Sequence, residues 1–182
     1  ATTSNFGNSE GFGAPPVYKR TVGALNASAQ LELIPIFDRR QQLFTGQRIE
    51  VVIQAHSLDD LAGYELDLKF DPRALRLLPS GGKEGDVFAR NPSGSVFDVR
   101  AEDGGRIRVL SSRYGKVWSA QGDPQLATLH FEVLREDALH TLQPGSGLLL
   151  SSEYDQQFVN WGGLLLDWIL PQTPGLDQNY PN

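Results

Sequence analysis

Apolar and polar residues alternate with a period of two along most of this chain, a pattern that predicts half-buried β-strands. The clearest example is 64–70, where the apolar side chains of one face alternate with the charged side chains of the other. The same alternation recurs at 49–55 and 127–133. A helix needs apolar residues every three or four positions, and only 135–142 offers a short stretch of that kind. Residues 30–170 are therefore expected to form strands.

Weaker strand signals fill the rest of this region. They lie at 31–36, 75–78, 96–100, 106–112, 147–151, 157–161 and 164–170. Turn residues separate them, among them Asp71-Pro72, Ser80-Gly81-Gly82, Asp103-Gly104-Gly105 and Pro144-Gly145. Many short strands at this spacing predict an all-β fold, a β-sandwich.

The 182 residues suit one hydrophobic core with additional segments at both ends. We expect an N-terminal extension at 1–29, a β-sandwich at 30–170 and a C-terminal linker at 171–182. The extension holds three charged residues, and within it 17–22 is a β-prone run bounded by Pro and Gly.

Charge and composition exclude several function classes. With 16 basic and 22 acidic residues the net charge is −6, so nucleic acid is not an expected partner. The chain has no Cys, and its longest apolar run, Leu164-Leu165-Leu166, is too short for a membrane span. The start Ala1-Thr2-Thr3-Ser4, without Met, is typical of a chain from which a signal peptide has been cleaved. We expect an extracellular or cell-surface location.

No catalytic constellation can be assembled from the sequence, and we predict that the protein is not an enzyme. His56 and His130 fall on the polar faces of their strands, and no carboxylate pair stands out among 22 acids. Trp118, Trp161 and Trp168 could form a sugar-binding platform, but core or interface packing is the favoured role.

Calcium is the one cofactor that the sequence leaves open. Four carboxylates near turns could supply hard oxygen ligands: Asp59, Asp60, Asp71 and Asp155. The alternative is that these acids are simply solvated.

Three segments together resemble a cohesin domain: 46–53, 61–75 and 122–133. The middle one, a Gly-aromatic strand running into Phe70-Asp71-Pro72 and Leu75, is the most specific. The resemblance implies a jelly-roll β-sandwich over 30–170 that docks other proteins at bacterial surfaces, with a dockerin-like partner.

The segment Leu176-Asp177-Gln178-Asn179-Tyr180-Pro181-Asn182 resembles the opening of the C-terminal sorting domain of the type IX secretion system. That resemblance implies a bacterial protein exported across the outer membrane.

Two hypotheses of function follow, both non-enzymatic. In the first, the sandwich is a structural subunit of an extracellular filament or surface assembly, and 17–22 docks as an added strand on another copy of the chain. Either Tyr18 and Val22 or Val17 and Thr21 would then fill the acceptor groove. In the second, the sandwich is a receptor for a dockerin-like protein or a carbohydrate.

The charged face of the strand at 64–70 supplies further candidate interaction residues. They are Glu65, Asp67 and Lys69.

Overall fold

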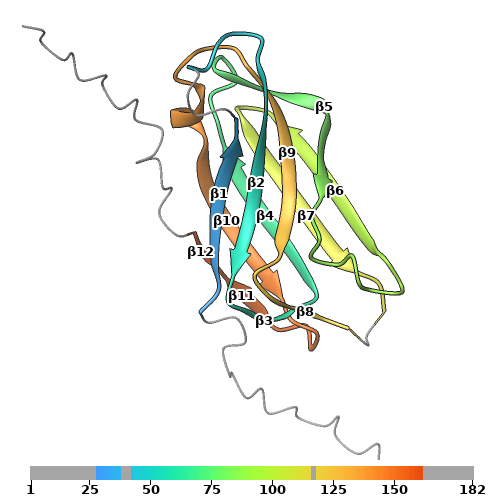
Figure 1. Ribbon diagram of the computed structural model, residues 1–182. Helices are drawn as coiled ribbons and strands as arrows, with labels where there is room; N and C mark the ends of the chain where they lie inside the picture. The colour runs from blue at the N-terminus through green and yellow to red at the C-terminus, as the bar shows by residue number, and fades with distance from the viewer. Residues whose placement is uncertain (1–27, 38–41, 116–117, 162–182) are drawn as a thin grey trace, which may run out of the picture.

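The computed structural model describes residues 28–37, 42–115 and 118–161, and these form two five-stranded sheets packed face to face (Figure 1). The strand order is β12-β1-β2-β9-β5 in the first sheet and β11-β10-β4-β7-β6 in the second. A third, two-stranded sheet joins β3 to β8. The predicted all-β jelly-roll sandwich is confirmed.

The strand bounds, in chain order, are β1 Gln30–Ile36, β2 Arg48–His56, β3 Leu58–Leu61, β4 Gly63–Lys69, β5 Leu75–Glu84, β6 Ser95–Glu102, β7 Arg106–Arg113, β8 Ala120–Gly122, β9 Gln125–Val133, β10 Gln143–Leu150, β11 Gln156–Phe158 and β12 Asn160–Trp161. The short stretch at 135–142 that could be helical forms one 3-10 turn, η1 at Ala138–Thr141.

The core lies between the two sheets and consists of the inward residues of each alternating strand. On β4 the inward side chains are Tyr64, Leu66 and Leu68, and on β9 they include Leu129 and Phe131. Leu66 and Phe131 are fully buried. Because the side-chain period of a strand is two, the register that buries these residues also fixes which residues face outward.

Two predicted turns lie inside strands. Ser80-Gly81-Gly82 falls within β5 and Pro144-Gly145 within β10, each at a register shift. At Gly82 a Cβ atom would lie 2.2 Å from the carbonyl oxygen of Thr128, so glycine permits the close approach that this irregularity needs. These glycines therefore mark bulges and not chain reversals.

The hairpin prediction at Gly104-Gly105 is confirmed, because both residues have positive φ and connect β6 to β7. Strands β3 and β8 were not predicted, since each is too short to show an alternation. The expected strand at 164–170, the segment at 17–22 and the linker at 171–182 lie outside the described residues.

Candidate functional site

The outward side of the second sheet, called here the outer face, is the candidate site. Its side chains come from alternate positions of β11, β10, β4, β7 and β6, which the strand register brings into rows. They are Gln156, Phe158, Leu148, Leu150, Gly63, Glu65, Asp67, Lys69, Arg106, Arg108, Leu110, Ser112, Val96, Asp98, Arg100 and Glu102.

One half of the outer face carries a network of ion pairs between neighbouring strands. Arg106 donates to Asp67 at 2.6 Å, and its Nε lies 3.7 Å from Glu102. Arg108 lies 3.2 Å from Glu65, 3.6 Å from Asp67 and 3.5 Å from Glu102. Two arginines of β7 thus hold acids of β4 and β6 on either side.

Asp67 is the centre of this network, and it is buried although it lies on the charged face of its strand. Glu65 and Lys69 are exposed as predicted, but Asp67 is buried beneath the two arginines. Ser146, which the register shift in β10 brings over the carboxylate, also donates to it, at 2.6 Å. Burial by itself raises the pKa of Asp67, but the hydrogen bonds from Arg106 and Ser146 and the charges of Arg106 and Arg108 outweigh it. The pKa of Asp67 is therefore lowered.

The other half of the outer face is apolar and open. Phe158 at the end of β11 is 80% exposed, and Val96 on β6 is 40% exposed. Leu148 and Leu110 lie between them in partly buried positions, with the exposed Glu65 between these two leucines and Asp98 beside Leu110. Tyr114, which directly follows β7, is 54% exposed. Exposed large side chains gathered on one face mark an interaction surface more often than a solvent surface.

A cluster of polar side chains between the two sheets connects the strands of the outer face to the first sheet. The Tyr64 hydroxyl donates to the carbonyl of Leu126 at 2.8 Å, and Glu84 of β5 accepts hydrogen bonds from Ser95, at 2.5 Å, and from Ser111. Burial, together with the nearby charge of Glu84, raises the pKa of Tyr64 well above its ordinary range. These bonds join the first sheet to β4, β6 and β7 of the second sheet and so hold the strands of the outer face in place.

The predicted interaction residues divide into two groups. Glu65, Asp67 and Lys69 all lie on the outer face, whereas Val17, Tyr18, Thr21 and Val22 lie outside the described residues. Arg106, Arg108 and Ser146 were missed, because their partnership with Asp67 depends on strand pairing between distant segments.

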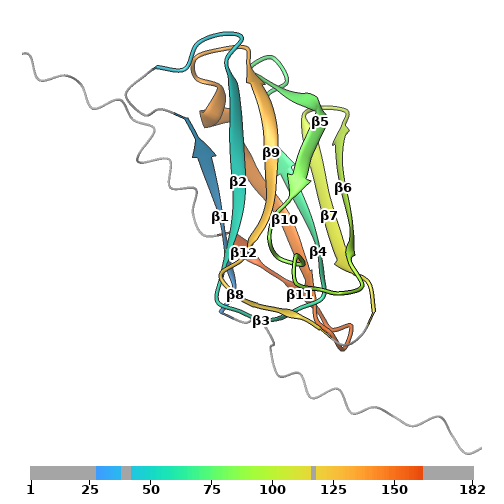
Figure 2. The ribbon, with the colours of Figure 1, turned by 45° about the vertical axis from the view of Figure 1, so that its right-hand side comes forward.

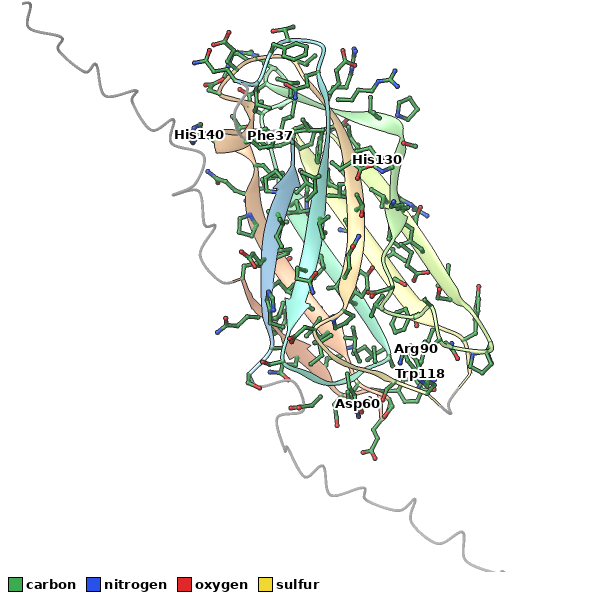
Figure 3. The ribbon with its side chains drawn as sticks, viewed as in Figure 1. Phe37, Asp60, Arg90, Trp118, His130 and His140 are labelled. Carbon is green, nitrogen blue, oxygen red and sulfur yellow. The ribbon has the colours of Figure 1, made fainter. Side chains whose placement is uncertain are left out.

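The four carboxylates proposed for calcium do not gather at one point. Asp60 lies at the lower end of the sandwich in Figure 3, where its carboxylate accepts from the backbone N–H and hydroxyl of Ser152 at 3.1 and 2.6 Å. Asp71 lies beyond the other end of β4, beside η1, where its N–H donates to Thr141 at 3.2 Å. In the described ranges no three His, Cys, Asp or Glu side chains form a metal-binding group. Calcium at Asp59, Asp60, Asp71 and Asp155 stays a prediction.

The histidines of β2 and β9 lie on the outward side of the first sheet. His56 is 3.2 Å from Glu32. His130 lies 3.1 Å from the Ser80 hydroxyl through Nδ1 and 3.6 Å from Glu50 through Nε2. Ser80, His130 and Glu50 lie together on the outward surface of the strands, and Figure 3 shows His130 on the outside of the sandwich.

The tryptophans of the described ranges pack against the core. Trp118 meets Phe88 edge to face with ring centroids 6.3 Å apart, and Trp161 also contacts the core. Trp168 lies outside the described residues. Core packing, the favoured prediction, therefore holds for Trp118 and Trp161.

Two packed sheets with an open, partly apolar face are features of β-sandwich modules that contact other proteins. The family model of the Cohesin domain matches residues 39–148, more than half of the chain, and the chain belongs to this family. Cohesin domains are modules of protein–protein interaction.

Solved cohesin structures share the fold. A type II cohesin from a cohesin–X–dockerin complex of Acetivibrio cellulolyticus has a TM-score of 0.57 at 12% identity, over 74% of this chain and 93% of that one. A cohesin module from a family 33 glycoside hydrolase of Clostridium perfringens has a TM-score of 0.55 at 11% identity, over 72% and 90%. A non-cellulosomal cohesin of Archaeoglobus fulgidus has a TM-score of 0.52 at 17% identity, over 73% and 85%.

No curated protein matches the chain by sequence. Among the residues that the structure describes, no helix has the length and apolar character needed to cross a membrane.

Proposed function

We propose that this chain is a non-enzymatic receptor module of an extracellular or cell-surface assembly, and that it binds a dockerin-like protein through the outer face of its second sheet. The observation that carries the proposal is the division of that face into an open apolar half and a half of fixed charges. Solved relatives support the choice of partner, because the Acetivibrio cellulolyticus cohesin was captured in a complex with a dockerin.

The apolar half would supply most of the binding energy. A partner side chain that covers Phe158 or Val96 removes exposed apolar surface from water, and each large side chain buried in this way contributes about 1.5–3 kcal/mol.

The charged half would select the partner. Arg106 and Arg108 are already held by Asp67 and Glu102, so they need little reorganisation when a partner arrives. Matching charges on a partner would steer association and disfavour incorrect partners, which is the usual role of charges at an interface. A carbohydrate has less support, because Trp118 and Trp161 pack against the core.

Isothermal titration calorimetry of the full chain with purified dockerin modules from the same genome tests the proposal. We expect Phe158→Asp to weaken binding by about 10-fold or more, because it places a charge in the apolar half. The matched control is Phe44→Asp, which changes another exposed aromatic residue, one that precedes β2 and lies off the outer face. Equal losses in both variants, or none in either, would contradict the proposal.

A second candidate is a structural subunit of a filament, joined to other copies through residues 17–22 as an added strand. It is supported by the second sheet ending at β6, beyond which the described chain places no further strand. Electron microscopy of the native exported material should then show filaments. Deletion of residues 1–29 should leave a folded monomer that no longer assembles, whereas loss of the fold itself would count against this candidate.

A further inference from the structure

The last strand of the second sheet, β6, presents an open edge of eight residues (Ser95–Glu102). In Figure 2 this strand forms the right-hand margin of the sandwich, and no strand lies beyond it. An open edge offers unpaired backbone N–H and C=O groups to another chain. We propose that β6 pairs with β6 of a second copy, in an antiparallel arrangement with Val99 on the two-fold axis.

Strand register shows which backbone groups the edge offers. The Tyr114 N–H donates to the Gly94 carbonyl at 2.9 Å, in the same register as the pairing of β6 with β7. Along an antiparallel strand, the backbone groups of alternate residues form hydrogen bonds to the neighbouring strand, and those of the residues between them point to the opposite edge. The even-numbered residues of β6 therefore bond to β7, and the odd-numbered residues Phe97, Val99 and Ala101 point their backbone groups toward the open edge.

The other side of β7 agrees with this assignment. The Arg113 N–H donates to the Ala62 carbonyl at 3.0 Å, so the odd-numbered residues of β7 bond to β4. On β5, a Cβ atom at Gly81 would lie 3.2 Å from the Val99 Cβ and 3.6 Å from the Val99 carbonyl oxygen, so β5 packs against Val99 and comes close to its backbone. Among the residues that the structure describes, no strand pairs with this edge.

The charges on β6 disfavour some registers of such a pair. Its outward residues include Asp98, Arg100 and Glu102, and within one copy Arg100 pairs with Asp98. Centring the pair on Val99 sets each Asp98 opposite the Arg100 of the second copy. Centring it on Asp98 sets two aspartates opposite each other. Centring it on Arg100 sets two arginines opposite each other and Asp98 opposite Glu102.

Of these three registers, only the one centred on Val99 sets opposite charges against each other. It also makes Phe97 face Ala101 and Val99 face Val99, which allows about six backbone hydrogen bonds. Charged residues usually protect an edge strand from pairing, because like charges meet in most registers. On β6 these charges disfavour the registers centred on Asp98 and Arg100. A register centred on Ala101 would also set Arg100 opposite Glu102, but it overlaps far less of β6 than the register centred on Val99.

The resulting dimer would have one continuous sheet that carries both outer faces on the same side. The pairing is isologous, so it closes after two copies and forms no fibre. Two copies of the proposed binding face would then act together, which raises the effective affinity for a partner with two binding modules. The inference concerns β6, which also carries Val96 of the proposed binding face, but it is tested separately from partner binding through Phe158, which lies on β11 at the other edge of the sheet.

A charge-exchange experiment with the full chain tests the inference. Light scattering after size-exclusion chromatography and sedimentation equilibrium should give twice the monomer mass for the wild type. Asp98→Arg and Arg100→Asp should each raise the dimer dissociation constant by about 10-fold or more, because each places like charges opposite one another. An equimolar mixture of the two variants should form a heterodimer.

The controls separate this pairing from other contacts. Lys69→Glu reverses a charge of the same outer face on β4, away from the edge, and should leave the dimer unchanged. Phe158→Asp and deletion of residues 1–29 should also leave it unchanged. The inference fails if the wild type is a monomer at millimolar concentration, or if the single reversals leave the dimer intact. It fails equally if the mixture stays monomeric while circular dichroism shows both variants folded.

Discussion

The register of β4 makes a sharp prediction about two adjacent residues. The Leu66 side chain points into the core and is 0% exposed to solvent, whereas Glu65 faces outward. Leu66 lies against Gly147, where a Cβ atom would come within 3.3 Å of its Cδ2 and 2.4 Å of Val159 Cγ1. The space is closely packed, so Leu66→Ala would leave a cavity between strands that cannot move together.

The cost of that cavity can be estimated from its surroundings. Leu→Ala substitutions in cores destabilise by about 2–5 kcal/mol, and more where the site cannot collapse. Because hydrogen-bonded strands surround Leu66, we expect about 3–4 kcal/mol, which corresponds to a fall in melting temperature of roughly 6–16 °C for a domain of this size. Glu65→Ala removes one exposed ion pair, with Arg108, and should cost about 0.5 kcal/mol or less.

Urea denaturation of both variants measures this difference directly. The free energy of unfolding should fall strongly for Leu66→Ala and hardly at all for Glu65→Ala, with similar m-values. Equal losses would show that the register of β4, and with it the composition of the outer face, is wrong.

Four further substitutions test other parts of the structure. Burial by itself raises the pKa of Asp67, but the hydrogen bond from Arg106 outweighs it, and the pKa is lowered. The charged carboxylate therefore stabilises the fold above about pH 4, the ordinary pKa of an aspartate. This stabilisation is lost as the pH falls through the lower pKa of the folded state. The urea midpoints of wild type and Asp67→Asn should therefore converge between pH 5 and pH 2, and a constant gap would refute the pairing. Gly105→Ala should destabilise by about 2 kcal/mol or more by thermal melting, because φ is +77° and a Cβ would lie 2.1 Å from a carbonyl oxygen. Gly104→Ala, at φ +79° with open space around it, should cost about 1 kcal/mol, and the reverse order would contradict the hairpin geometry. Tyr64→Phe should cost about 1 kcal/mol in the same melting assay, since it removes one of the two hydrogen bonds to the Leu126 carbonyl and leaves the one from the Gly85 N–H, and an unchanged melting temperature would argue against the Tyr64 bond.

Much of the fold follows from local patterns, because a strand with one buried face must alternate. The run at 64–70 defines both the core face and the outward Glu65 and Lys69 without any knowledge of neighbouring strands. The short strands β3 and β8 could not be predicted, since their pairing and not their composition makes them strands.

The candidate site was predictable only in part. Asp67 was placed correctly on the outer face, but its burial depends on Arg106, which is distant in sequence and reaches it through the pairing of β4 with β7. Ser146 reaches the same carboxylate because β10 shifts register, and the Pro144-Gly145 pair that marks this shift resembles a turn in the sequence. Long-range register is the information that local patterns lack.

Methyl NMR of the full chain, titrated with a dockerin-like partner, is the most direct test of the central claim that the outer face of the second sheet binds protein. The methyl signals of Leu148, Leu110 and Val96 should shift or broaden on addition of the partner, because these side chains lie on that face. Val52, on the outward side of the first sheet, supplies the internal control and should not change. Shifts at Val52 with unchanged signals from Leu148, Leu110 and Val96 would contradict the account.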